Sequence, residues 1–95
     1  MVYIVEITPK AKRELKTLPK AVLVEVACVI DALVINPRPK GCKNLKGVKG
    51  ILRIRVGDYR ILYRVIDSIL QVLVIRIGNR REVYRDLTAS LKSPT

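Results

Sequence analysis

The strongest constraint on the fold lies in the segment RIRVGDYRILYR, from Arg53 to Arg64. Gly57-Asp58 suits a two-residue type II′ turn, with glycine at the first central position, so the flanking residues form an antiparallel hairpin in which Arg55 faces Arg60. Successive side chains of a strand point to opposite faces. One face therefore carries Leu52, Ile54, Val56, Tyr59, Ile61 and Tyr63, and the other carries Arg53, Arg55, Arg60 and Arg64.

The arginine-bearing face of this hairpin predicts that an anion binds there. Like charges directly opposite each other destabilise a sheet by roughly 0.2–1 kcal/mol per pair. The whole chain is also basic, with 19 Lys and Arg against 8 Asp and Glu and a formal net charge of +11. Such a surplus in a folded domain predicts a polyanionic partner: nucleic acid first, an acidic protein second and a membrane surface third.

The composition predicts one globular domain over residues 1–95, because 49% of the residues are hydrophobic. The N-terminal segment lacks the apolar core and cleavage site of a signal peptide, and no apolar run is long enough to span a membrane. We therefore expect a cytoplasmic protein that is not bound to a membrane. The two cysteines lack C-x-x-C spacing and there is no histidine, so we expect no metal site and no cofactor.

Hydrophobic periodicity and turn residues predict an α+β fold: a strand, two helices and then a three-strand antiparallel meander. Thr8 and Pro9 are typical of a helix start, as N-cap and first helical residue. Pro19 separates the first helix from the second, and Gly78-Asn79 is expected to break the last strand. The predicted strands are residues 2–7, 51–56, 59–66 and 70–77, and the predicted helices are residues 9–18 and 19–35.

The predicted second helix is apolar nearly all round its circumference. Its β-branched residues would also suit a strand, but residues 19–35 are too many for an ordinary strand in so small a protein. Two interpretations of its apolar surface remain open. The helix packs between the first helix and the sheet, or a partner protein covers part of it.

Lysine and arginine are segregated along the chain. Residues 1–49 hold eight lysines and two arginines, whereas residues 53–85 hold eight arginines and no lysine. Arginine offers a planar fork of donors that matches phosphate, although codon bias and a solvated sheet face are an alternative explanation. The antiparallel order of the last strands brings Arg80 and Arg81 near Arg55 and Arg60, with Tyr84 a few residues later, which predicts a phosphate-binding cluster.

Several segments together resemble the RelE/ParE toxin superfamily over roughly residues 2 to 87. They are YIVEITPKAKRELKTLP, NPRPKGCKNLKG, RIRVGDYRILYRV and VIRIGNRREVYRD. The resemblance implies a compact RelE-like fold and the toxin half of a type II toxin–antitoxin pair. It further implies mRNA cleavage in the ribosomal A site if the chain is RelE-type, or poisoning of DNA gyrase if it is ParE-type.

The positions that match the RelE-type pattern favour the RelE-type activity. Arginines stand where lysines are familiar at residues 53 and 55, and Asn79 stands where many relatives have histidine. The resemblance implies as partners mRNA on the ribosome, with rRNA contacts, and a cognate acidic antitoxin in a hetero-oligomer. The predicted catalytic residues are Arg55, Arg60, Arg80 and Tyr84; the predicted RNA- and phosphate-binding residues are Arg53, Arg55, Arg60, Arg81, Lys46 and Lys49.

The predicted reaction is metal-independent RNA cleavage, in which the substrate's own 2′-hydroxyl attacks the adjacent phosphate. It requires a base, an acid and charge stabilisation. In a chain without histidine the base is Tyr84, a carboxylate such as Glu82, or a group of the ribosome. Nearby arginines would lower the pKa of a tyrosine from its usual value near 10. A gyrase-directed toxin and a non-enzymatic nucleic-acid-binding protein are the alternatives.

Overall fold

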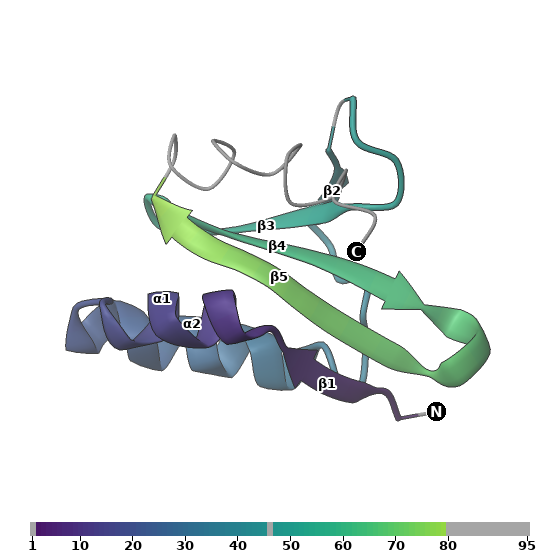
Figure 1. The fold of residues 1–95 in the computed structure, drawn as a ribbon, viewed down its shortest axis with the longest axis horizontal. Helices are drawn as coiled ribbons and strands as arrows, with labels where there is room; N and C mark the ends of the chain where they lie inside the picture. Colours follow the sequence, from purple (N-terminus) through teal and green to yellow (C-terminus); the bar gives the residue numbers. More distant parts are fainter. Residues whose placement is uncertain (1, 46, 80–95) are drawn as a thin grey trace.

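The structure is a computed structural model that describes residues 2–45 and 47–79. Five strands form one mixed sheet in the order β1-β5-β4-β3-β2, in which β1 runs parallel to β5 and the other neighbours are antiparallel (Figure 1). The predicted α+β class is confirmed. The elements are β1 (Ile4–Ile7), α1 (Pro9–Lys16), α2 (Lys20–Ala32), β2 (Lys43–Asn44), β3 (Leu52–Val56), β4 (Tyr59–Ile66), the 3₁₀ helix η1 (Asp67–Ile69) and β5 (Gln71–Asn79).

The β3–β4 hairpin has the predicted turn and register. Gly57 has φ +60°, as the first central position of a type II′ turn requires, and a side chain there would be strained. Arg55 lies opposite Arg60, and Ile54 lies opposite Ile61. The two-residue turn and the alternation of apolar and basic residues around it therefore predicted this part of the fold correctly.

The start of α1 follows from its N-cap. The Thr8 hydroxyl accepts a hydrogen bond from the Ala11 amide at 3.2 Å, and Pro9 occupies the first helical position, as predicted. Both helices are shorter than expected: α1 ends at Lys16 and α2 at Ala32. After α2 the chain continues as turns to residue 35, ahead of the Pro37 and Pro39 that exclude a longer helix.

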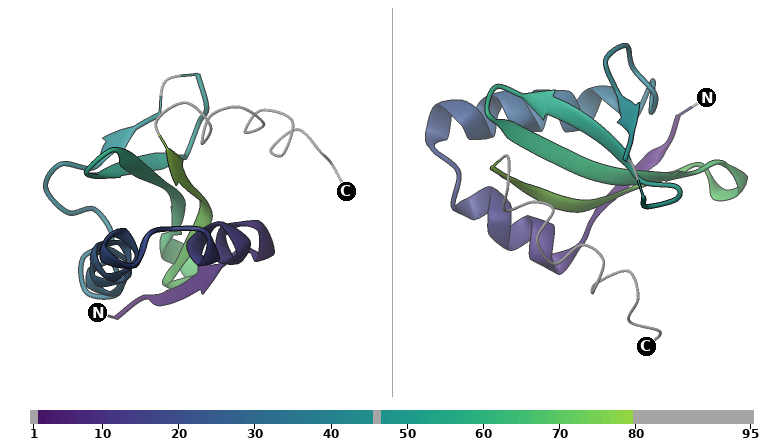
Figure 2. Two further views of the ribbon diagram at one scale, coloured as in Figure 1. Left: turned by 90° about the vertical axis from the view of Figure 1, so that its left-hand side faces the viewer. Right: turned by 90° about the horizontal axis from the view of Figure 1, so that it is seen from above.

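The two helices lie side by side on one face of the sheet, where α1 packs against β5 and α2 against β3 (Figure 2). Of the two interpretations of α2, the one in which it packs between α1 and the sheet is wrong, because each helix contacts the sheet directly. The buried core lies between these helices and the sheet. It consists of Ala11, Val26, Ile30, Leu33, Leu52, Ile54, Val56, Ile61, Tyr63, Val72, Val74 and Ile77.

This arrangement leaves part of α2 uncovered. Val24 is 57% exposed and Cys28 is also exposed, because the helix contacts the sheet through one side only. None of the helices in the described ranges, 2–45 and 47–79, has the length and apolar character needed to cross a membrane.

The last strand differs from the prediction in two ways. It continues through Gly78 to Asn79, because both residues pair with β4 and glycine is tolerated at a ladder position. The register also shifts by one residue opposite Leu62 and Tyr63. Such a bulge places an extra residue on one strand and changes which side chains share a face, which hydrophobic periodicity alone does not reveal.

Candidate nucleic-acid interface

Two rows of residues cross the sheet on the face that points away from the helices. In one row, Arg55, Arg60 and Gly78 lie opposite one another on β3, β4 and β5. Side chains in directly opposite positions have Cβ atoms about 4.5–5.5 Å apart, so cations within a row are immediate neighbours. The other row consists of Lys43, Arg53, Leu62 and Arg76. Below, "basic face" denotes Lys43, Arg53, Arg55, Arg60 and Arg64.

Arg60 lies on β4, between β3 and β5 and close to the turn of the β3–β4 hairpin. Only 5% of its surface is exposed, and among the residues that the structure describes its buried Nε atom has no hydrogen-bond partner. Its neighbour on β5 is Gly78, which has no side chain to offer. The sequence placed Arg60 off the core face, which is correct, but not in a buried position. A buried donor without a partner costs about 1–3 kcal/mol, and more for a charged group.

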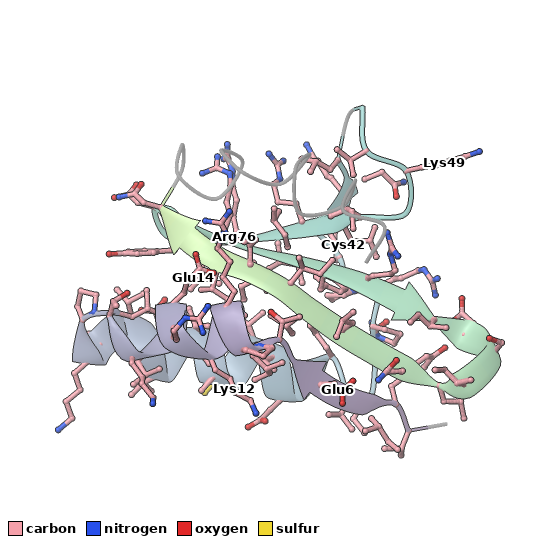
Figure 3. All side chains as sticks on the ribbon, viewed as in Figure 1. Glu6, Lys12, Glu14, Cys42, Lys49 and Arg76 are labelled. Atoms are coloured by element: carbon pink, nitrogen blue, oxygen red, sulfur yellow. The ribbon has the colours of Figure 1, made fainter. Side chains whose placement is uncertain are left out.

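The other cations of this face are more accessible than Arg60. Arg55 is exposed, and Arg53 and Arg64 are half-buried. Lys43, which lies opposite Arg53, is a further candidate that sequence analysis missed, because the two-residue strand β2 gives no periodic signal. Lys49, predicted to bind RNA, is exposed and extends away from the sheet (Figure 3).

Arg76 lies beside the basic face, and an acidic residue of α1 balances its charge. Its Nε and Nη2 atoms lie 3.1 and 3.0 Å from the Glu14 carboxylate of α1. Figure 3 shows the two side chains together between α1 and β5. Neither residue was a predicted site residue. Glu14 is the single acidic residue of α1, and Arg76 is the single charged residue of β5. Their opposite charges were the one feature of these two elements from which the ion pair could have been predicted.

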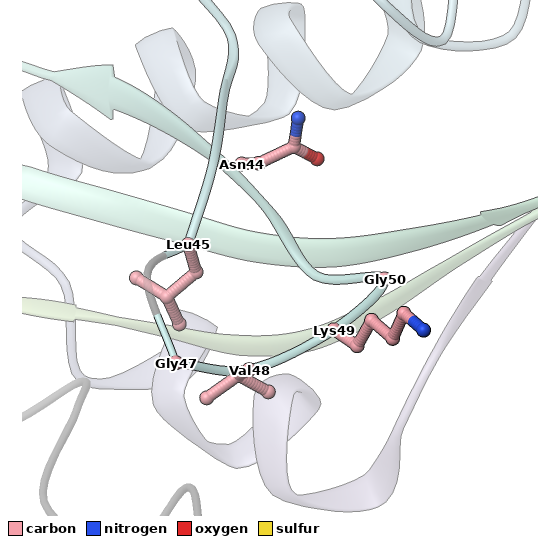
Figure 4. A pocket seen from close by; sticks show the side chains of 6 residues that line it. All are labelled: Asn44, Leu45, Gly47, Val48, Lys49 and Gly50. Atoms are coloured by element: carbon pink, nitrogen blue, oxygen red, sulfur yellow. The ribbon is translucent and has the colours of Figure 1, made fainter.

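An open hollow of about 420 Å³ lies in the loop after β2. Residues 44, 45 and 47–50 line it (Figure 4). Leu45 and Val48 pack with the buried Ile51 and Leu62 in a small apolar cluster that is separate from the main core. The arginines of the basic face do not line this hollow, so it is separate from the predicted phosphate-binding cluster.

Four predicted site residues lie outside the described residues: Lys46, Arg80, Arg81 and Tyr84. Glu82, the alternative base, also lies outside them. The last described residue, Asn79, pairs with Tyr59, one position beyond the row that contains Arg55 and Arg60. The roles of the residues outside the described ranges remain predictions.

The described part of this face is suited to binding anions. Guanidinium and ammonium groups carry several donors and no acceptor, and arginine stays protonated at any relevant pH. They can stabilise negative charge on a phosphate, but they are poor proton carriers near neutral pH. In the described ranges, no group of three or more His, Cys, Asp or Glu residues is placed to hold a metal ion.

A mixed sheet with two helices on one face and clustered arginines on the other defines a small α+β domain with a basic face. Residues 5–84 match the family of ParE toxins of type II toxin–antitoxin systems. The chain belongs to this family, and thereby to the RelE/ParE toxin superfamily that its motifs resemble.

Relatives and solved structures agree with that assignment. Toxin RelG of Mycobacterium tuberculosis is 33% identical over 86 residues, which is 90% of this chain and 99% of RelG. The toxin–antitoxin complex RelBE2 of the same organism contains a chain with 32% identity and a TM-score of 0.74, covering 84% of this chain and 100% of that one. The archaeal RelE–RelB complex of Pyrococcus horikoshii gives 28% identity and a TM-score of 0.75, with 86% and 99% covered. The chain is therefore a toxin of the RelBE type.

Proposed function

We propose that this toxin is a ribosome-dependent endoribonuclease that cleaves mRNA in the A site and so inhibits translation. Its relatives over nearly the whole chain carry the names RelG and RelE, and the basic face supplies the charge that a polyanionic substrate requires. Because residues 5–84 match the ParE toxin family, a gyrase-directed toxin is the alternative function. The experiment must distinguish it from an endoribonuclease.

The observation that carries this proposal is Arg60. A guanidinium that is 5% exposed, with an unpartnered Nε, lies directly opposite a second arginine, Arg55. Two cations in this arrangement repel each other, and burying one of them adds a desolvation cost. A phosphate between them would supply the missing acceptors and offset both costs, because charge-assisted arginine–phosphate hydrogen bonds are strong and often bidentate.

The proposed reaction needs no metal ion or other cofactor. A base removes the proton of the 2′-hydroxyl, the O2′–P bond forms, the P–O5′ bond breaks, and an acid protonates the leaving 5′-oxygen. The products are a 2′,3′-cyclic phosphate and a 5′-hydroxyl. Arg55 and Arg60 would stabilise the negative charge that develops on the phosphorane, and Arg80 would join them. Tyr84, Glu82 or a ribosomal group would act as the base.

Pulse-labelling after induction of the toxin tests this function. Incorporation of labelled methionine should fall first, while incorporation of labelled thymidine persists. An early fall in thymidine incorporation would instead indicate a gyrase-directed toxin. Normal growth and normal synthesis of both polymers, with the toxin folded and abundant, would indicate a non-enzymatic nucleic-acid-binding protein.

Removal of one hydroxyl tests the role of Tyr84. Tyr84→Phe should slow cleavage on programmed ribosomes by about 100-fold, the usual contribution of a general base, and should leave ribosome binding unchanged. Cleavage at the wild-type rate would show that Tyr84 is not the base, and Glu82→Gln would then be the next variant to measure.

We further propose that an acidic antitoxin neutralises this chain in a hetero-oligomer. The support is the net charge of +11, the exposed apolar residues Val24 and Ile35 in and after α2, and relatives whose structures are complexes with RelB. Apolar burial at roughly 25 cal/mol per Å² favours binding, although ordering a flexible segment offsets part of it. Opposite charge would speed association.

Co-expression tests this partnership. The reading frame next to this gene should encode a short acidic protein that restores growth and co-purifies with the toxin. A neighbouring product that neither binds the toxin nor relieves its effect would contradict the proposal.

A further inference from the structure

The outer edge of β5 changes its partner halfway along the strand. β1 pairs with β5 from Gln71 to Val74 and then ends, and no other strand among the described residues pairs with this edge of β5. Unpaired backbone groups at such an edge need other partners. The start of α1 supplies the first two: the Thr8 amide donates to the Val74 carbonyl at 3.0 Å, and the Thr8 hydroxyl donates to the Ile75 carbonyl at 3.0 Å.

Glu14 supplies the next partner on this edge. Its Oε1 atom accepts a hydrogen bond from the Ile77 amide at 2.9 Å, while Oε2 binds the Arg76 guanidinium. The side chains of Arg76 and Glu14 are only 7% and 21% exposed. One carboxylate therefore holds a side chain and the adjacent backbone amide of β5 in an environment where charge-assisted hydrogen bonds are strong.

The bulge in β5 explains why this contact matters for the basic face. Val72, Val74 and Ile77 belong to the main core, whereas Ile75 belongs to the small cluster on the other side of the sheet. One extra residue thus lies between Val74 and Ile77, and it brings Arg76 opposite Leu62. Gly78 consequently lies opposite Arg60, with no side chain beside that guanidinium.

We propose that Glu14 is a positioning residue of the basic face: by holding Arg76 and the Ile77 amide, it fixes the bulged end of β5 and keeps Gly78 opposite Arg60. Glu14 also withholds the Arg76 guanidinium from the substrate by neutralising it. The effect on cleavage rests on the function proposed above, whereas the effect on the geometry of β5 does not.

Glu14→Gln tests the charge of this contact, because glutamine keeps the shape and can still accept from the Ile77 amide. The matched control is Glu25→Gln on α2, an exposed position with the same change in net charge. On programmed ribosomes, Glu14→Gln should lower kcat about 10-fold, as small misplacements of a reacting group do, while KM stays equal or falls. Glu25→Gln should change neither. A loss of stability alone would reduce the amount of active toxin and leave KM and the turnover of the folded fraction unchanged.

A second variant tests whether the altered charge balance between residues 14 and 76 causes the defect. In the double variant Glu14→Gln, Arg76→Gln, two neutral amides can bind each other, and kcat should return to within about 3-fold of wild type, since the pair is again balanced in charge. A double variant as slow as Glu14→Gln alone, or a Glu14→Gln toxin as fast as the Glu25→Gln control, would overturn the proposal.

Hydrogen exchange provides a readout that does not depend on cleavage. Glu14→Ala should increase exchange of the Ile77 amide at least 10-fold and shift the Gly78 resonance, while the Ile61 amide keeps its protection. Unchanged Ile77 protection in folded Glu14→Ala would refute the positioning role even if the wild type proves inactive on ribosomes. Loss of Ile77 protection in an inactive toxin would uphold the contact and reject the proposed function instead.

Discussion

The two faces of the sheet are built from the same strands but hold their buried residues by different means. On the helix-covered face, Ile61 is fully buried among apolar side chains. Its neighbour on the opposite face, Arg60, is almost as buried, yet its Nε atom has no partner among the described residues. Of two adjacent positions in one strand, Ile61 thus stabilises the fold by apolar burial, whereas Arg60 destabilises it by burying a donor without a partner.

This difference indicates that the faces have separate roles. The helix-covered face supplies the apolar burial that holds the fold together, while the other face keeps cations close together despite their repulsion. Variants on the two faces should therefore affect different measurements, stability in one case and activity in the other.

The largest effect is expected from Arg60. Arg60→Ala should abolish growth arrest and lower cleavage by at least about 100-fold, because a group that stabilises transition-state charge contributes on that scale. Arg60→Met, which keeps the apolar stem, should be as inactive while its free energy of unfolding stays equal or rises, since a buried charge is removed. Growth inhibition and urea denaturation measure the two quantities.

The exposed Arg13 of α1 provides the matched control for Arg60. Arg13→Ala removes the same charge from the opposite side of the molecule and should remain toxic. Arg80→Ala is expected to behave like Arg60→Ala, although it lies beyond the described residues. Full toxicity of a folded Arg60→Ala protein would remove the basis for the phosphate site.

Truncation of two neighbouring residues compares the apolar clusters of the two faces. Ile61 and Leu62 are both fully buried, the first in the main core and the second in the small cluster. Ile61→Ala should lower the free energy of unfolding by about 3–5 kcal/mol and Leu62→Ala by about 2–3 kcal/mol, because a small cluster can collapse around the cavity more easily. Equal losses in chemical denaturation would show that both faces stabilise the fold alike.

Sequence reasoning predicted those parts of the fold that depend on short, periodic patterns. The hairpin register followed from Gly57-Asp58 and the alternation around it, and the α1 start followed from Thr8 and Pro9. The burial of Arg60 was not predictable, because alternation assigns a face but not a degree of exposure. The same alternation correctly assigned the hairpin arginines to the face that points away from the helices.

The parts that were missed depend on contacts between distant segments. The pairing of Lys43 with Arg53 comes from a two-residue strand, and the bulge in β5 comes from packing on two sides of the sheet. The Glu14–Arg76 contact joins residues 62 positions apart. No local periodicity reports on such contacts, and tertiary packing decides them.

A smaller effect is expected from Tyr63, whose ring belongs to the helix-covered face. Its hydroxyl donates to the buried Pro37 carbonyl at 2.8 Å, so Tyr63→Phe should lower the free energy of unfolding by about 1–2 kcal/mol. Burial raises the pKa of this hydroxyl well above its usual value. It therefore remains a donor, and the loss should be the same at pH 6 and pH 9. Tyr59→Phe serves as the half-buried control, and an equal loss there would contradict the role of the hydrogen bond.

The smallest effect is expected at the exposed counterpart of the Glu14–Arg76 pair, at the other end of β5. Asp67 accepts hydrogen bonds from Arg38 at 3.2 and 2.8 Å and from the Tyr3 hydroxyl at 2.7 Å. These bonds, with that of Arg38 foremost, lower the pKa of Asp67 to about 2. Both side chains of the Arg38–Asp67 ion pair are at least half exposed, so solvent weakens the contribution to stability.

The sign of the pH dependence follows from the lowered pKa of Asp67. An unfolded aspartate takes up its proton near pH 3.9, whereas the folded one keeps its charge to about pH 2. The stabilisation is therefore complete above about pH 4 and is lost as the pH falls toward 2. Asp67→Asn should lower the Tm at pH 7 by roughly 2 °C or less, and the difference from wild type should shrink between pH 4 and 2. A difference for Asp67→Asn that persists at pH 2 would show that the ion pair is not its origin.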